Sequence, residues 1–232
     1  MKKIVSTLFA LSILSSTSLM ADDLSVEVTN LSSGLHFTPI FVAAHASTQP
    51  IFKEGEAAST SLQAMAEGGD ISGLSTDVQA LGGNVVENPA SGLLAPGVST
   101  SFTLMTSDSN THLSLTAMLL PTNDGFVGMD GLMLPTSTGT YTYYLNAYDA
   151  GTEANNEVIN GGGTLGVLGI PADPGGNAGS NGTGITNTAE NSQIHIHRGI
   201  VGDTDATGGE SDLNSTVHRW LNPVARIVIT VN

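Results

Sequence analysis

The stretch Pro121-Thr-Asn-Asp-Gly-Phe-Val-Gly-Met-Asp130 joins a polar turn to an apolar, strand-like run, and Tyr148-Asp-Ala-Gly-Thr-Glu153 forms a matching turn further on. Each turn places carboxylates beside a glycine at the end of such a run. A glycine lets the backbone bend tightly, and carboxylates four residues apart across a turn can converge on one ion. Brought together, the two turns would form the oxygen-only pocket that a hard cation such as calcium requires.

Apolar and polar residues alternate with a period of two in the segments around these turns, which is the pattern of half-buried strands. Short strands separated by turns indicate an all-β fold, an antiparallel β-sandwich. We also expect a strand at Phe37–Ala44, with Pro39 at an edge or bulge, and one resuming at Gln193–Ile200. The remaining expected strands are 24–29, 98–104, 113–119, 140–148 and 227–231.

One or two short helices are expected after the second strand. Thr60 and Gln63 fit a capping box, and Gly68 suits the C-terminal stop of the first helix. A second, shorter helix would place Leu74, Val78 and Leu81 on one side. Residues 160–184 are rich in Gly, Asn and Ser and are expected to form a long loop within one domain, residues 22–232.

The two turns also resemble the spondin domain, the module at the N-terminal side of F-spondin and mindin that also occurs in bacterial secreted proteins. The resemblance implies a β-sandwich of C2-like character in which the two turns meet, so that Asp124, Asp149 and Glu153 bind calcium. Animal members usually have Trp where this chain has Gly125, and they carry cysteines, which this chain lacks. The segments that carry the resemblance are 123–128, 146–153, 36–45, 62–70 and 222–227.

The first 21 residues have the pattern of a secretory signal peptide. Lys2 and Lys3 precede a short apolar core, and a run of mostly small residues ends at Ala21, where we expect cleavage. The formal net charge of the whole chain is −15, and removing two lysines makes it more acidic. Such a surface repels nucleic acid and anionic membranes. We therefore expect a secreted or periplasmic protein with no integral membrane segment after cleavage.

From the residues alone, each aspartate can also be explained as a turn residue that hydrogen-bonds its own backbone. Asp130 is a further candidate ligand, although it lies within a strand and could face solvent. Asp203-Thr-Asp-Ala-Thr-Gly208 resembles the first half of a calcium loop, but Asn214 stands where an EF-hand needs Glu. For Asp203 and Asp205 the sequence therefore favours a solvated acidic turn.

Two other constellations suggest different functions. His195 and His197 alternate on one strand face, which could hold copper or zinc in a metalloprotein or enzyme, although two hydrogen-bonded surface histidines are the simpler interpretation. Tyrosines could line a carbohydrate-binding face, or could pack as cross-strand pairs; they are residues 141, 143, 144 and 148.

No set of catalytic residues is assembled in the sequence. We therefore expect a non-catalytic adhesion or interaction module that binds calcium. Its partner would be a protein or glycan of the cell surface or matrix, which the sequence does not identify.

Overall fold

The computed structural model describes residues 23–176, 178–189 and 191–232. The expected signal peptide, residues 1–21, lies outside the described residues. The helices are α1 (Thr60–Gly68) and α2 (Ser72–Ala80). The strands are β1 (Asp23–Asn30), β2 (His36–Phe37), β3 (Phe41–His45), β4 (Asn84–Glu87), β5 (Ser99–Met105), β6 (His112–Leu120), β7 (Gly125–Met133), β8 (Gly139–Asp149), β9 (His195–Ile196) and β10 (Ala225–Val231).

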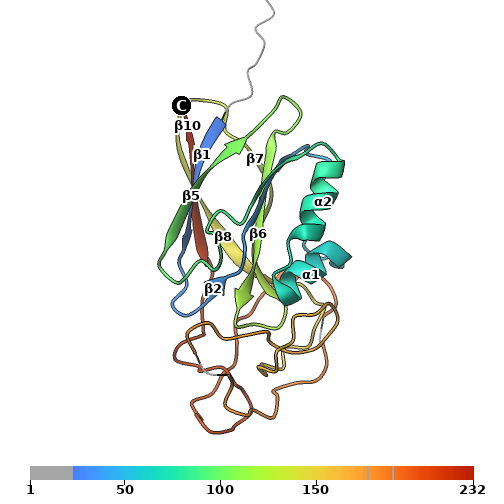
Figure 1. The fold of residues 1–232 in the computed structure, drawn as a ribbon, viewed down its shortest axis with the longest axis vertical. Coiled ribbons are helices and arrows are strands. Elements are labelled where there is room, and N and C mark those ends of the chain that lie inside the picture. The colour runs from blue at the N-terminus through green and yellow to red at the C-terminus, as the bar shows by residue number, and fades with distance from the viewer. Residues whose placement is uncertain (1–22, 177, 190) are drawn as a thin grey trace, which may run out of the picture.

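The strands pair antiparallel along the path β4-β3-β6-β7-β8-β10-β1-β5, with β2 beside β6 and β9 beside β8. Strand β8 belongs to both halves of this path. Its first part, Gly139–Leu145, pairs with β10, whereas Asn146–Asp149 pairs with β7. Because one continuous strand joins the two sheets, they fold over each other as the two layers of a sandwich (Figure 1). The predicted antiparallel β-sandwich is confirmed.

Two apolar clusters hold the layers together. The larger one fills the space between the sheets and includes Val26, Leu115 and Ile229, each fully buried. The second lies between the outer face of the β3-β6-β7 sheet and the helices, which cover that face (Figure 1), and it includes Met65 and Phe126. In β3, β6 and β7 successive residues face one cluster and then the other, because side chains alternate between the two faces of a strand.

Some expected element boundaries are wrong. The expected strand at 37–44 is split into β2 and β3, which is consistent with the restriction that Pro39 places on strand geometry. The α1 N-cap is Ser59, not Thr60: the Ser59 hydroxyl accepts a hydrogen bond from Leu62 N, and Gly69 in a left-handed conformation ends the helix. Leu81 follows α2 and is 61% exposed, so it does not share the buried side of Leu74.

The expected strand at 193–200 is reduced to the two residues of β9, which pair with Tyr148 and Asp149 at the end of β8. Between Asp149 and His195, the part of the chain that the structure describes contains no named helix or strand. The loops between β8 and β10 gather at one end of the sandwich (Figure 1).

Candidate metal site

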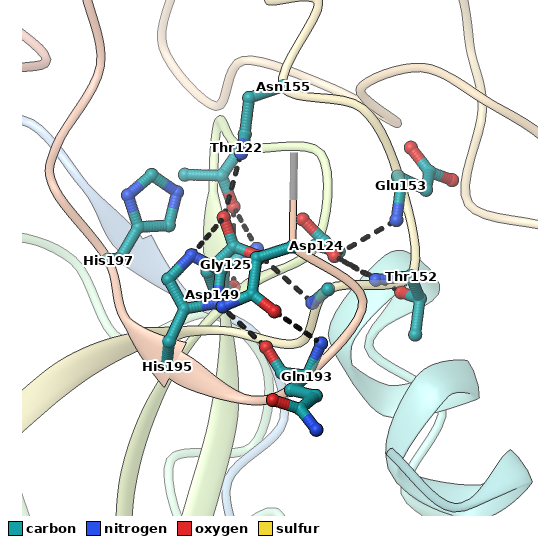
Figure 2. Close-up of polar contacts among 12 residues, drawn as sticks. Thr122, Asp124, Gly125, Asp149, Thr152, Glu153, Asn155, Gln193, His195 and His197 are labelled. Atoms are coloured by element: carbon teal, nitrogen blue, oxygen red, sulfur yellow. Dashed lines mark hydrogen bonds and ion pairs between the residues drawn. The ribbon is translucent and has the colours of Figure 1, made fainter. Parts of the chain in front are cut away.

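The pairing of β7 with β8 brings the two acidic turns together. Gly125, the first residue of β7, lies opposite Asp149, the last residue of β8. Asp124 therefore sits beside Asp149, and the Ala150 N–H donates to the Asp124 carbonyl over 3.2 Å. Figure 2 shows both carboxylates at the loop end of the sheet. The expectation that the two turns lie at the same end of the sandwich is met.

Asp124 is fully buried, and only one of its carboxylate oxygens has a hydrogen-bond partner within the part of the chain that the structure describes. Oδ2 accepts hydrogen bonds from Thr152 N at 2.7 Å, Glu153 N at 3.1 Å and Thr152 Oγ1 at 3.2 Å. Oδ1 is buried and has no hydrogen-bond partner among the described residues. Burial, and then the nearby Asp149 carboxylate, raise the pKa of Asp124 to about 7 against the opposing effect of these hydrogen bonds.

Asp149 shapes its own turn. Its Oδ1 accepts from Gly151 N at 2.8 Å, and its Oδ2 accepts from Asn155 Nδ2 at 2.7 Å. Gly151 has φ +71°, and a Cβ there would stand 2.8 Å from the carbonyl oxygen of Asn191, so this turn requires glycine. Each carboxylate oxygen of Asp149 still has capacity for a further ligand, because it has two lone pairs.

Glu153 enters the site through its backbone rather than through its carboxylate. Its N–H donates to Asp124, while its side chain points away from Asp124 (Figure 2). Glu153 Oε2 accepts from Gly169 N at 3.1 Å and Asn123 Nδ2 at 3.3 Å, and Oε1 is buried without a partner among the described residues. Burial raises the pKa of Glu153 to about 7.

A hollow of about 350 Å³ gives access to this end of the sandwich. Asp149 and Glu153 both line it, together with Asn155, His195 and Arg198. Within the described residues, no three His, Asp or Glu side chains are grouped so as to hold a metal ion. The structure therefore brings Asp124 and Asp149 together, and Glu153 would have to turn its carboxylate toward them to complete the predicted ligand set.

The two histidines have different environments. His197 is buried, its ring centroid lies 4.9 Å from that of Trp220, and its Nδ1 accepts from Gly199 N at 3.0 Å. Burial lowers the pKa of His197 to about 4, although the nearby Asp149 opposes this effect. A neutral ring that accepts at Nδ1 carries its proton on Nε2. His197 Nε2 therefore has no free lone pair for a metal while this hydrogen bond holds.

His195 has the opposite arrangement. Its Nδ1 lies 2.7 Å from the Gln193 carbonyl, which can only accept, so Nδ1 carries the proton. Its Nε2 lies 3.8 Å from Asp149 Oδ2. The side chain of His195 is 37% exposed, whereas that of His197 is buried, so the two do not present a shared surface chelate. The copper or zinc interpretation is not favoured by this geometry.

The other acidic candidates have structural roles in loops. Asp130 Oδ1 accepts from Ile51 N at 2.7 Å and from Ser114 Oγ at 2.8 Å, so it holds a neighbouring loop. Asp203 and Asp205 accept hydrogen bonds from backbone N–H groups of their own loop, as expected of an acidic turn. Sequence reasoning missed Asn123 and Asn155, whose amides hold the site carboxylates; Asn123 adjoins Asp124, but Asn155 gives no comparable signal.

The fold and this carboxylate-rich end define a β-sandwich module whose loops at one end carry the candidate site. A family model described as Spondin_N matches residues 29–158, more than half of the chain and including both acidic turns. The chain belongs to the spondin domain family. No curated protein matches it. No helix within the described residues combines the length and apolar character needed to cross a membrane.

Proposed function

We propose that this chain is an exported, non-catalytic interaction module of spondin type, whose acidic loop end binds calcium through Asp124, Asp149 and Glu153. Family membership supports the module type, and the N-terminal signal pattern supports export to the periplasm or the cell exterior. Calcium belongs to this proposal because it links the β7 and β8 ends to the loop that follows Asp149, and so gives the module one fixed loop surface for its partner.

The observation that carries the calcium proposal is the buried Asp124 Oδ1, which lies near a second carboxylate and has no hydrogen-bond partner in the described residues. An unpaired buried carboxylate oxygen is costly, and two like charges at close range repel each other. A hard cation with oxygen ligands would remove both costs. The orphaned Oε1 of Glu153 and the hollow lined by Asp149 and Glu153 are further support for a cation at this end.

The test is thermal melting of the secreted chain in chelator, calcium or magnesium. Calcium at about 100 times its dissociation constant adds about 2.7 kcal/mol of stability, which for a domain of this size is about 5 to 11 °C in Tm. Magnesium should give a smaller rise, because it demands a tighter octahedron and gives up water reluctantly. Asp149→Asn should lose the calcium effect, and Asp205→Asn, in the acidic turn away from the site, should keep it.

The calcium assignment is wrong if calcium leaves the Tm of the parent unchanged or raises that of Asp149→Asn equally. The interaction role is tested separately, by capture of binding partners from the native cell envelope. Copper or zinc bound stoichiometrically to the purified chain and lost in His197→Ala would favour the metalloprotein alternative.

A further inference from the structure

A second hollow, of about 380 Å³, lies on the outer face of β7 and β8, away from the acidic turns. Because side chains alternate along a strand, Tyr144, Asn146 and Tyr148 project from the outer face of β8. Tyr141 and Tyr143 have the opposite orientation and pack against the core between the sheets. The four tyrosines are therefore divided between two roles, and only Tyr144 and Tyr148 line the hollow.

The floor of this hollow contains a glycine. Gly128 of β7 lies opposite Asn146 of β8. A Cβ at Gly128 would stand 2.8 Å from the ring of Phe52, so glycine lets that ring close down on the sheet. Phe52 also contacts Tyr148, with ring centroids 5.2 Å apart. The result is a floor with a half-buried amide, Asn146, between aromatic side chains.

The wall of the hollow is a short loop held at both ends. Ile51 N donates to Asp130 Oδ1 over 2.7 Å at one end of the loop. At the other end, Gly55 N donates to the Ile194 carbonyl, and Ile194 N donates to the Glu56 carbonyl, each over 2.8 Å. These hydrogen bonds fix the loop, so Phe52, Lys53 and Glu54 line a hollow of defined shape. Preformed concave sites of this kind are typical of small-ligand binding.

The Asp130 carboxylate is held in place by a side chain of the neighbouring strand. Ser114 Oγ donates to Asp130 Oδ1 over 2.8 Å, and the same hydroxyl oxygen accepts from Gly131 N over 2.9 Å. His45 Nε2 lies 2.7 Å from Ser114 Oγ, so the hydroxyl is itself held on its buried side. Asp130 is therefore fixed at the edge of the hollow that it lines.

The polar groups at the hollow are mostly hydrogen-bond acceptors. Lys53 forms an ion pair with Glu56, and the Tyr148 hydroxyl hydrogen-bonds the Glu54 carboxylate. The carboxylates of Glu54 and Asp130 therefore remain as acceptors beside the Asn146 amide. Such a lining can accept hydrogen bonds from the hydroxyl groups of a ligand and repels anionic ligands.

We propose that this hollow binds a neutral saccharide, with one sugar ring stacked on Tyr144 and its hydroxyls hydrogen-bonded to Asn146, Glu54 and Asp130. Tyr144 is 61% exposed, and an exposed tyrosine ring offers a flat apolar face with a polar tip. The C–H face of a sugar ring carries partial positive charge and packs on the negative face of an aromatic ring. The proposal names a ligand class for the interaction role above, and Asp124, Asp149 and Glu153 do not line this hollow.

The test is an array of neutral hexose and N-acetylhexosamine oligosaccharides, with sialylated glycans, sulfated glycans and a choline-coated surface for comparison. The labelled chain should bind neutral glycans, and Tyr144→Ala should weaken that binding about fivefold to tenfold. Tyr144→Phe keeps the ring and should bind like the parent. Met133→Ala removes an exposed apolar side chain that lies on β7 outside the hollow. This variant should also bind like the parent.

The proposal is overturned if no neutral glycan binds, if choline or charged glycans are preferred, or if Tyr144→Ala binds as well as Tyr144→Phe. Melting of each variant with and without calcium accompanies the array. Because Tyr144 is largely exposed, Tyr144→Ala should melt as the parent does and keep its response to calcium. Loss of glycan binding with an intact calcium response would separate this site from the proposed metal site.

Discussion

At the residue scale, Asp124 organises the loop end of the sandwich. Its Oδ2 accepts three hydrogen bonds from Thr152 and Glu153, so Asp124 fixes the turn that follows β8. In chelator, Asp124→Ala should lower the free energy of unfolding by at least about 2 kcal/mol, because buried N–H donors are left without acceptors at about 1–3 kcal/mol each. Urea denaturation measures this change.

Asp124→Asn is the matched variant. The amide oxygen of asparagine can still accept from the same donors, and the repulsion from Asp149 is removed. Asn should therefore destabilise the calcium-free chain less than Ala does. If the free energy of unfolding of Asp124→Ala lay within about 0.5 kcal/mol of the parent value, the size of an ordinary surface effect, Asp124 would not hold this turn.

The resemblance to the spondin domain predicted the meeting of Asp124 and Asp149, but not the direction of Glu153. The residues alone did not predict the meeting, which the pairing of Gly125 with Asp149 produces. The direction of the Glu153 carboxylate depends on Gly169 N, a donor from a loop without periodic pattern. No local sequence rule specifies such a contact, because it is set by tertiary packing.

At the element scale, β10 confirms the period-two pattern of the C-terminal strand. Ile227 and Ile229 are fully buried and Val231 is 5% exposed, while Arg226 and Thr230 on the alternate face are only partly buried. Strands such as β1, β6 and β10 were predictable because one face of each must be buried. The N-cap of α1 and the extent of β9 were not, because a single hydrogen bond decides the first and tertiary pairing with the end of β8 decides the second.

Strand β10 also gives a direct test of the sandwich core. Ile229→Ala should lower the free energy of unfolding by about 2–5 kcal/mol, because it removes buried apolar surface and leaves a cavity between the sheets. Thr230→Ala, the neighbour on the other face, should change it by less than about 0.5 kcal/mol. Equal effects of the two variants in a denaturant melt would show that the face of β10 is assigned incorrectly.

At the scale of the whole molecule, β8 connects the core, the acidic turns and the proposed saccharide hollow. Its first part closes one sheet against β10, and its last residue, Asp149, reaches the loop end. Tyr144 and Tyr148 project from the same strand toward the helical side. A cation at Asp149 would therefore stabilise a strand on which both layers depend, and calcium should raise the stability of the whole domain rather than of one loop.

The most direct test of the calcium proposal is isothermal titration of calcium into the chelator-treated chain. We expect one site with a dissociation constant of about 10⁻⁴–10⁻³ M, the range of extracellular modules, and no measurable binding to Asp149→Asn. Asp205→Asn should bind as the parent does. A parent that binds no calcium in this range, or an Asp149→Asn variant that binds it equally well, would contradict the account.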